Sequence, residues 1–360
     1  MANGSARDVR ISEISPLRSP DQLSCQLPLS NDDRDRISQF RENVNNIISG
    51  KDNRLLAIVG PCSIHDPKAA LEYAEKLKKL ADEISDQFFV VMRTYFEKPR
   101  TALGWKGLIT DPDMDKSYDI DKGLEVCRKL LLDITHIGLP VGCECLDPIV
   151  PQYTDELMSW SSIGARTTES QTHRSLASGL SVAIGFKNST SGDFTAAINA
   201  VKSAREPAAF IGIRRNGVIA QFHTTGNNFA HIILRGGVNG ANYYENDVES
   251  AESAMKKAGL DPAIVIDCSH ANSNKDYTRQ KRVLRSVIDH KIWGNKSIRG
   301  FMLESNLFEG NQSIPCNLNE LKYGVSVTDA CIGWEETERI MKHAADILRK
   351  AKENGGEEIL

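Results

Sequence analysis

The sequence predicts an α/β protein built as a (β/α)8 TIM barrel with an N-terminal extension and an inserted β-hairpin. Eight short apolar runs are each followed, within one to three residues, by a polar or ionisable residue that a buried strand would not normally carry. Helical periodicity recurs between the runs, and alternating strands and helices favour parallel pairing. A parallel barrel gathers its strand ends on one face, so these residues are expected to meet in one pocket.

The eight predicted barrel strands are, in order, LLAIVG, FVVM, PVGC, SIGA, VAIGF, HIIL, IVIDCS and GFML. The residues that follow or end them are Cys62, Arg93, Glu144, Arg166, Lys187, Arg235, His270 and Glu304. Stretches 69–84, 123–134 and 278–291 have helical spacing. A doubly wound open sheet is the alternative from alternation alone, but no glycine-rich dinucleotide fingerprint follows a strand.

Two segments stand outside this alternation. Residues 1–50 are predicted to form the extension, with a strand at VRISEI (9–14) and a helix near 33–49 that ends at Gly50, and residues 51–360 to form the barrel. Near 210–223, Asn216-Gly217 lies between two alternating runs, which predicts an inserted antiparallel hairpin. After the last strand, a long irregular segment precedes a final helix from about 335. Long loops on this face usually carry function.

Composition excludes several classes of partner. Lys and Arg total 44 against 48 Asp and Glu, and they are dispersed, so we expect no binding of nucleic acid or of an anionic membrane. No apolar run approaches the roughly 20 residues of a membrane span, and the N-terminus lacks the apolar core of a secretory signal. Eight scattered cysteines are typical of reduced thiols rather than a disulfide scaffold. These features predict a cytoplasmic protein.

Four of the strand ends are cationic, and they predict an anion site. Arg93, Arg166, Lys187 and Arg235 would repel one another on one face unless an anion or acidic partners compensated. The forked guanidinium suits both carboxylate and phosphate, which favours a small polyanionic substrate. After the second strand, Lys98, Arg100 and Thr101 lie in a loop rich in proline and glycine, and could hold a second phosphate. A solvated charged loop is the alternative.

The remaining strand ends offer metal ligands. Cys62, His270 and Glu304, with Asp329 in the loop after the last strand, form a mixed thiolate, imidazole and carboxylate set. Such a set suits a divalent transition metal better than Mg²⁺ or Ca²⁺. No local spacing such as C-x₂-C supports it, so a buried core cysteine and a satisfied histidine stay open as alternatives. Glu144 could orient or deprotonate water or a substrate group, or could form a plain salt bridge.

The motifs around these residues resemble the type I 3-deoxy-D-arabino-heptulosonate 7-phosphate (DAHP) synthases over about residues 9–345. They include GPCSIHD (60–66), RTYFEKPRT (93–101), IGARTTESQTHR (163–174), GFKN (185–188), ILRGG (233–237), DCSHANSNKDY (267–277) and SVTDACIGWE (326–335). The resemblance implies a metal-dependent barrel enzyme, dimeric or tetrameric, that condenses phosphoenolpyruvate with erythrose 4-phosphate. The reaction releases phosphate and is the first step of the shikimate pathway toward aromatic amino acids.

The resemblance also assigns roles. Cys62, His270, Glu304 and Asp329 are implied as ligands of one divalent ion (Mn²⁺, Fe²⁺, Co²⁺ or Zn²⁺), and Arg93, Arg166, Lys187 and Arg235 as the phosphoenolpyruvate site. Lys98, Arg100 and Thr101 are implied as the erythrose 4-phosphate site. Lys98 is also the expected proton donor to the aldehyde oxygen, with His270 or a metal-bound water as competitors, and Glu144 completes the catalytic set.

Feedback inhibition is a further implication. FIGI (210–213) and DCSHANSNKDY look most like the tyrosine-sensitive isozymes. A regulatory pocket for the amino acid would then involve Pro151, Gln152, Leu180, Ser181, Phe210, Gly212 and Phe222, with Gly212 leaving room for a phenolic hydroxyl. Ordinary packing of the hairpin on the barrel is the alternative interpretation of these residues.

The sequence departs from the family pattern at three places. Ser189-Thr190-Ser191-Gly192 stands where the family usually has Gly-Thr-Asp-Gly, Ser175 replaces a usual glutamate, and Ala102 replaces Thr or Val. The first departure leaves a non-catalytic aromatic amino-acid sensor as an alternative function. Condensation of phosphoenolpyruvate with another aldose phosphate, arabinose 5-phosphate, is the second alternative, although the KPRT loop argues against it.

Overall fold

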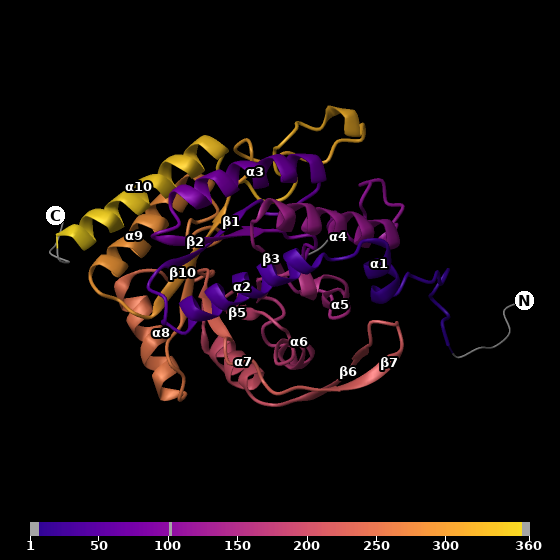
Figure 1. Cartoon of the computed structure of the whole chain (residues 1–360), viewed down its shortest axis with the longest axis horizontal. Coiled ribbons are helices and arrows are strands. Elements are labelled where there is room, and N and C mark those ends of the chain that lie inside the picture. Colours follow the sequence, from indigo (N-terminus) through magenta and orange to yellow (C-terminus); the bar gives the residue numbers. More distant parts are fainter. Residues whose placement is uncertain (1–6, 101–102, 355–360) are drawn as a thin grey trace, which may run out of the picture.

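Eight parallel strands close into a barrel in the computed structural model, which describes residues 7–100 and 103–354. Neighbouring strands follow the order β1-β10-β9-β8-β5-β4-β3-β2, and helices surround them (Figure 1). The strands are β1 (Leu55–Gly60), β2 (Phe88–Arg93), β3 (Val141–Glu144), β4 (Trp160–Ile163), β5 (Ala183–Lys187), β8 (His231–Leu234), β9 (Ile264–Asp267) and β10 (Ile298–Glu304). The predicted (β/α)8 barrel is confirmed.

The described helices begin and end at the signals that their sequences carry. Asp66 accepts hydrogen bonds from the backbone amides of Lys68 and Ala69 at the start of α3, and Gly138 ends α4 in the left-handed conformation at φ 86°. The α-helices are α1 (Pro20–Gln26), α2 (Asn31–Ile48), α3 (Pro67–Glu83), α4 (Ile120–Ile137), α5 (Pro151–Thr154), α6 (Gln171–Ala177), α7 (Thr195–Arg205), α8 (Glu245–Lys257), α9 (Gln280–Ile292) and α10 (Trp334–Glu353). No described helix is both long and apolar enough to cross a membrane.

The core has two layers because successive strand residues point to opposite faces. In β1, Leu55, Ala57 and Val59 pack under the surrounding helices, while Leu56 and Ile58 fill the barrel interior. Residues of α2 join the interior cluster, since Val44 and Ile47 pack there and are fully buried. Because α2 clusters with Leu56 and Ala183 at the amino ends of β1 and β5, the carboxyl ends of the strands are left for the site.

The N-terminal extension differs from its prediction. Residues 9–14 form no strand, so that prediction is wrong, and Val9, Ile11 and Ile14 are largely exposed. A strand needs a partner for its backbone hydrogen bonds, and this stretch has none in the described chain. The predicted helix forms as α2, and α1 precedes it. The division of the chain at residue 50 stays a prediction.

The inserted hairpin is confirmed. Strands β6 (Ala209–Ile213) and β7 (Ile219–His223) pair antiparallel, and Gly217 takes φ 82° in the turn between them. The hairpin projects beside α1 (Figure 1), where its turn residue Arg215 contacts Asp21 at 3.0 Å and Glu156 at 3.0 Å. These ion pairs join the hairpin to elements that precede it by more than fifty residues.

One polar pair lies within the apolar barrel interior. The indole Nε1 of Trp160 donates a 3.2 Å hydrogen bond to Nε2 of His231, and Nδ1 of His231 lies 2.9 Å from the carbonyl oxygen of Phe229. Burial lowers the pKa of His231 to about 4, so the imidazole is neutral. A neutral ring with Nδ1 protonated satisfies both contacts, which is what a buried polar group requires.

We expect Trp160→Phe to reduce the free energy of unfolding by about 2–4 kcal/mol, because it leaves the His231 Nε2 without a donor and opens a small cavity. Urea denaturation followed by circular dichroism measures this change. Trp293→Phe is the matched control, since Trp293 is exposed and its loss should change stability by no more than about 0.5 kcal/mol. Equal effects of the two changes would contradict the structural role assigned to the pair.

Candidate active site

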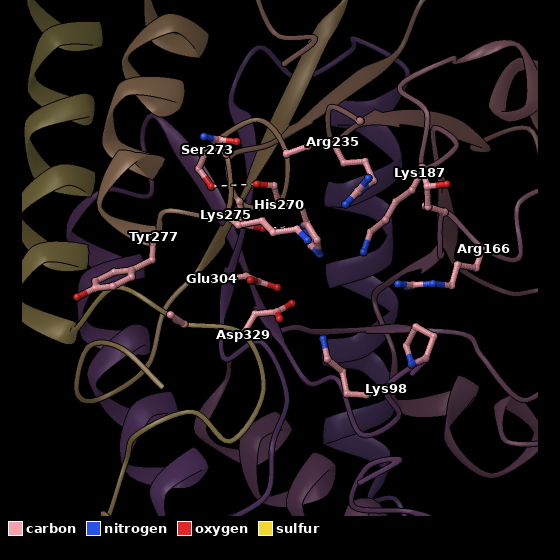
Figure 2. Close-up of a pocket in the computed structure, with 18 of the residues that line it drawn as sticks. Lys98, Arg166, Lys187, Arg235, His270, Ser273, Lys275, Tyr277, Glu304 and Asp329 are labelled. Carbon is pink, nitrogen blue, oxygen red and sulfur yellow. Dashed lines mark hydrogen bonds between the residues drawn. The ribbon is translucent and has the colours of Figure 1, made fainter. Parts of the chain in front are cut away.

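The residues predicted from the eight strand ends gather at the carboxyl end of the barrel. They surround or lie directly beneath one cavity of about 970 Å³. Six of them line it: Glu144, Arg166, Lys187, Arg235, His270 and Glu304. Arg93 contacts Glu304 from below, and Cys62 lies with Glu304 and Asp329. The predicted convergence therefore holds in space, as Figure 2 shows for the labelled residues.

The cavity carries an excess of positive charge. Its lining includes six lysines or arginines and three carboxylates: Lys98, Arg100, Arg166, Lys187, Arg235 and Lys275 against Glu144, Glu304 and Asp329. Such a surface attracts anions and concentrates them locally, although the net charge of the whole chain is −4. The electrostatics of the cavity thus suit a ligand with more than one negative charge.

Arg93 lies at the bottom of this arrangement and is fully buried. Its Nη2 donates to Oε1 of Glu304 at 3.1 Å, and its guanidinium carbon lies 4.0 Å from the ring centroid of Tyr95. Burial opposes the charge, but Tyr95 and Glu304 hold the pKa of Arg93 above its usual value. Nη1 has no hydrogen-bond partner among the described residues. A buried, unpartnered donor of this kind suits a ligand oxygen.

Lys187 and Glu144 form the second buried pair. The Lys187 Nζ lies 2.7 Å from Oε2 of Glu144, and both groups line the cavity. Burial opposes both charges, yet each partner stabilises the other, so the pKa of Lys187 is raised and that of Glu144 is lowered. The ion pair that the sequence left as an alternative for Glu144 is therefore present, and it places a carboxylate beside the cationic wall.

Arg166 and Arg235 complete that wall. Burial lowers the pKa of Arg235, Asp267 opposes this shift, and the positive charge of Arg166 adds to it. Two guanidiniums close enough to repel are stabilised by an anion bound between them.

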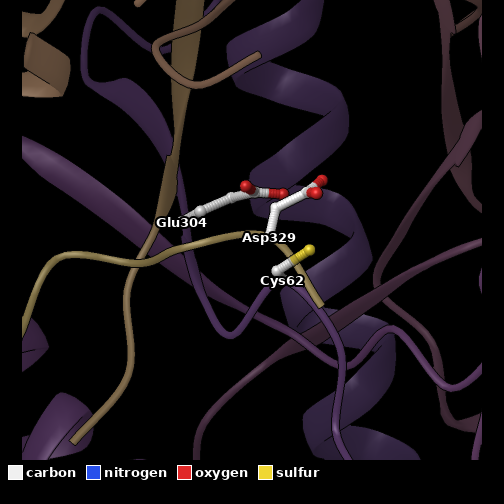
Figure 3. A group of neighbouring side chains, drawn as sticks. All are labelled: Cys62, Glu304 and Asp329. Atoms are coloured by element: carbon white, nitrogen blue, oxygen red, sulfur yellow. The ribbon is translucent and has the colours of Figure 1, made fainter. Parts of the chain in front are cut away.

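A compact donor group lies beside the cationic wall. The ligand atoms of Cys62, Glu304 and Asp329 all lie within 4.8 Å of one another (Figure 3). Burial and the nearby Glu304 raise the pKa of the Cys62 thiol to about 11. Burial opposes ionisation of Asp329, but Lys98 and His270 hold its pKa below the usual range. One sulfur and two carboxylates this close would be stabilised by a divalent cation, and the mixed set fits a transition metal.

His270 lines the same cavity but is not one of these three. Its Nδ1 lies 2.8 Å from Oδ2 of Asp267 and 2.8 Å from Oγ of Ser269. His270 has a positive φ of 54°, which turns the chain sharply after β9. A carboxylate on Nδ1 is the usual outer support of a histidine that binds metal through Nε2. The arrangement leaves Nε2 for that role.

The loop after β2 brings two of its three predicted residues to the cavity. Nζ of Lys98 donates to the carbonyl oxygen of Cys62 at 3.0 Å, and Arg100 lines the cavity mouth. Burial disfavours the Lys98 charge, but Cys62 and Glu304 raise its pKa above the usual value, so the amine is protonated. Thr101 and Ala102 lie outside the described residues.

Three supporting residues were missed from the sequence. Asp267 holds His270, Tyr95 lies beneath Arg93, and the side-chain amide of Gln280 forms hydrogen bonds of 2.9 and 2.8 Å with the backbone of Glu304. Asp267 and Tyr95 could have been found by spacing, because each lies two or three residues from a predicted site residue. Gln280 begins α9, and no local pattern connects it to β10.

The unusual Ser189–Gly192 segment forms an ordered turn. The hydroxyls of Ser189 and Ser191 lie 2.7 Å apart, and the Gly192 amide donates to the Ser189 carbonyl at 3.1 Å. Gly192 alone of the four has a positive φ, at 105°, so the loss of the other glycine causes no backbone strain. Thr190 and Lys187 both line the cavity. The turn therefore lies beside Lys187 despite the unusual Ser189 and Ser191.

The predicted regulatory residues fall into two groups. Phe210 and Phe222 stack at 5.4 Å on the hairpin, where a Cβ on Gly212 would lie 3.1 Å from the Phe222 ring. Of the seven, Pro151 and Leu180 line a second cavity of only about 20 Å³, whereas Gln152 and Ser181 do not. A cavity of that volume has room for about one water molecule. An amino acid would have to open it.

Fold and site together define a class: a (β/α)8 barrel with a cation-lined cavity beside a cluster of side chains that could hold a metal ion. The model of the DAHP synthetase I family matches residues 27–342, and the chain therefore belongs to this family. The family resemblance drawn from the motifs is confirmed. The predicted enzyme class, 3-deoxy-7-phosphoheptulonate synthase, is also confirmed.

Individual relatives agree with this assignment. The chain is 52% identical over 342 residues to the Tyr-sensitive phospho-2-dehydro-3-deoxyheptonate aldolase of Escherichia coli, covering 95% of this chain and 96% of the relative. It is 48% identical to the Phe-sensitive enzyme of the same organism, covering 95% and 97%. A solved phospho-2-dehydro-3-deoxyheptonate aldolase from Francisella tularensis superposes with a TM-score of 0.92 at 46% identity, covering 94% and 98%.

We expect Cys62→Ser to weaken divalent-metal binding by roughly 10–100-fold, because it removes the soft ligand of the three-residue group. Metal content after dialysis against a buffered Mn²⁺ or Co²⁺ solution, measured by plasma mass spectrometry, reports this change without an activity assay. Cys331→Ser is the matched control, since Cys331 is also buried but is not one of the three. Unchanged metal content in the Cys62 variant would contradict the assignment.

Proposed function

We propose that this chain joins phosphoenolpyruvate to erythrose 4-phosphate in the cavity at the carboxyl end of the barrel. The products are DAHP and inorganic phosphate, and the reaction is the first step of the shikimate pathway. The observation that supports this location most directly is the charge of the lining, six lysines or arginines against three carboxylates. Both substrates are phosphate esters, and phosphoenolpyruvate adds a carboxylate, so together they match such a surface.

Phosphoenolpyruvate is assigned to the wall formed by Arg166, Lys187 and Arg235, with Arg93 beneath it. The unpartnered Nη1 of Arg93 and the mutual repulsion of Arg166 and Arg235 support this assignment. The enol carbon C3 attacks the aldehyde carbon of erythrose 4-phosphate to form the new C–C bond. Water then adds to the cationic C2 before phosphate leaves. Glu144, an ionised carboxylate held by Lys187, is assigned to orient that water.

Erythrose 4-phosphate is assigned to the loop after β2, with its aldehyde group beside the proposed metal ligands. Arg100 and Thr101 hold the phosphate, and protonated Lys98 is placed to give a proton to the aldehyde oxygen as the C–C bond forms. Cys62, Glu304, Asp329 and the Nε2 of His270 would hold one divalent ion, Mn²⁺, Fe²⁺, Co²⁺ or Zn²⁺. When bound, such an ion supplies Lewis acidity that polarises a carbonyl oxygen.

Purified protein should release phosphate from phosphoenolpyruvate only when erythrose 4-phosphate and a divalent metal are both present. We expect Lys98→Met to lower kcat by at least about 100-fold, in line with the loss of a general acid. Arg100→Met should mainly raise the KM for erythrose 4-phosphate, because it removes a phosphate contact.

Two controls separate the alternatives. Arabinose 5-phosphate replaces erythrose 4-phosphate in a parallel assay, and a chelator is added in another. Turnover with arabinose 5-phosphate alone would identify the sister reaction, and binding of an aromatic amino acid without any phosphate release would identify a sensor. Either result would overturn the proposal.

Feedback inhibition by tyrosine is part of the proposed function. Its support is the family resemblance at FIGI (210–213) and the Tyr-sensitive relative at 52% identity. The regulatory pocket is assigned to Pro151, Gln152, Leu180, Ser181, Phe210, Gly212 and Phe222. The aromatic pair of the hairpin suits a phenyl ring.

Tyrosine should inhibit phosphate release more strongly than phenylalanine or tryptophan does. Gly212→Ala should weaken this inhibition by about tenfold, or about 1.4 kcal/mol, because the added methyl group occupies space beside the Phe222 ring. Gln221→Ala is the matched control, since Gln221 is a polar, exposed residue of the paired strand β7. Indifference to tyrosine in the parent enzyme would reject the assignment.

Self-association and location complete the proposal. The hairpin exposes Ile211, Val218 and Ile219, and the N-terminal segment exposes Val9 and Ile14. Apolar side chains grouped on projecting segments suit a homodimer or homotetramer. The proposed location is the cytoplasm, where the phosphorylated substrates occur, with no nucleic-acid or membrane partner.

A further inference from the structure

Glu97 is a buried acid that the proposed chemistry does not use. It lies between Phe96 and Lys98 in the segment that carries β2 into the erythrose 4-phosphate loop, and it is only 7% exposed. No lysine, arginine or histidine among the described residues forms an ion pair with its carboxyl group. Its carboxyl group accepts a long hydrogen bond, 3.4 Å, from the backbone amide of Asp147, and its other hydrogen-bond partner is the backbone of Leu146. A charged carboxylate would be poorly stabilised there.

The side chains of Glu97 and Lys98 face different cavities. Lys98 lines the main cavity, whereas Glu97 lines the second cavity of about 20 Å³ with Cys143 and Cys145. Pro151 and Leu180, assigned above to regulation, line this second cavity too, and Glu144 lines both. The Glu97 carboxyl therefore lies where the loop after β2 packs against the loop after β3.

Ionisable groups from each neighbouring element face Glu97. Asp147 follows β3, and Glu144, Cys143 and Cys145 belong to β3 or the next residue. Cys127 belongs to α4, and Asp155 to the 3-10 helix after α5. Every one of these groups is neutral or negative. Burial, followed by the charge of Asp147, raises the pKa of Glu97 to about 8. The acid is thus mainly neutral at pH 7 and ionises slightly above it.

We propose that Glu97 is a positioning residue for the aldose phosphate, whose neutral carboxyl group holds the loop after β2 against the loop after β3. A neutral carboxyl can approach Asp147 without repulsion. An ionised one is repelled by Asp147 and Glu144, and the cavity of about 20 Å³ has room for only about one water molecule to solvate it. Ionisation would then displace the loop, and with it Lys98 and Arg100. The inference rests on the proposed function, because it concerns binding of that reaction's second substrate.

The sign of the stability effect follows from the raised pKa. Between pH 4.5 and about 8 the folded protein keeps the Glu97 proton and the unfolded chain has lost it, so ionisable Glu97 makes the folded state less stable as pH rises. Glu97→Gln has nearly the same volume and never ionises. Its melting temperature should therefore exceed that of the parent by a margin that grows from pH 5 to pH 8.

The test is the KM for erythrose 4-phosphate between pH 6.5 and 9.5, with phosphoenolpyruvate saturating. We expect the parent KM to rise roughly tenfold with a midpoint near pH 8. An increase of this kind follows when ionisation of Glu97 displaces the substrate-binding groups of Lys98 and Arg100. Glu97→Gln should have a low KM throughout. Asp147→Asn, which removes the neighbouring charge, should move the midpoint to lower pH, because that charge is the second cause, after burial, of the raised pKa of Glu97.

The outcomes are separable. A flat KM profile in the parent, or the same rising profile in Glu97→Gln, would overturn the inference while leaving the proposed function intact as long as phosphate is released. A pH-dependent melting difference without any change in KM would also overturn it, since Glu97 would then affect only stability. If Glu97→Gln does not fold, the midpoint shift in Asp147→Asn decides the question: no shift contradicts the role of Glu97.

Discussion

The site depends on holding several desolvated charges at one end of the barrel. Arg93 with Glu304, and Lys187 with Glu144, form ion pairs of 3.1 and 2.7 Å in which all four side chains are nearly inaccessible. Isolated buried charges would be destabilising by several kcal/mol each. Pairing lets the barrel keep them at the same cavity that Arg166, Arg235 and Lys98 line. In the proposed function, substrate recognition uses charges whose burial the fold has already compensated.

Each of the two pairs also shares a residue with a neighbouring group of side chains. Glu304 belongs both to the Arg93 pair and to the donor group with Cys62 and Asp329, so the proposed anion site and the proposed metal ligands share a residue. Glu144 belongs both to the Lys187 pair and to the wall of the small cavity next to Glu97. Glu144 therefore lies between the main cavity and the small cavity that Glu97 lines. The shared residue Glu144 is a physical reason for proposing that Glu97, in the loop after β2, influences the main cavity.

Much of the fold and the site could be predicted from the sequence because the barrel repeats one local pattern. An apolar run followed by Arg93, Lys187 or Glu304 marks both a strand and the end of the strand that faces the cavity. The hairpin was predictable from Asn216-Gly217, whose turn chemistry is local. Contacts between distant elements were not predictable in this way. Gln280 binds the backbone of Glu304 across 24 residues, and no periodicity in either segment indicates the pairing.

The N-terminal segment shows a different limit. Alternating apolar residues at 9–14 are typical of a strand, but a strand forms only where an unpaired edge is available, and that depends on tertiary or quaternary context. In the described chain Val9, Ile11 and Ile14 remain exposed. The same reasoning applies to Glu97: its residue type indicates a surface charge, and only the packing of two loops reveals a buried acid. Local chemistry was predictable, whereas the environment that modifies it was not.

The central claim is that anion-binding and metal-binding residues from separate strands act on one bound substrate. Anomalous diffraction from crystals grown with Mn²⁺ and phosphoenolpyruvate tests it most directly. The account predicts one anomalous peak among the donor atoms of Cys62, Glu304 and Asp329, and phosphoenolpyruvate density in contact with Arg166, Lys187 and Arg235. A peak elsewhere, or a ligand that leaves those three cations unoccupied, would contradict it.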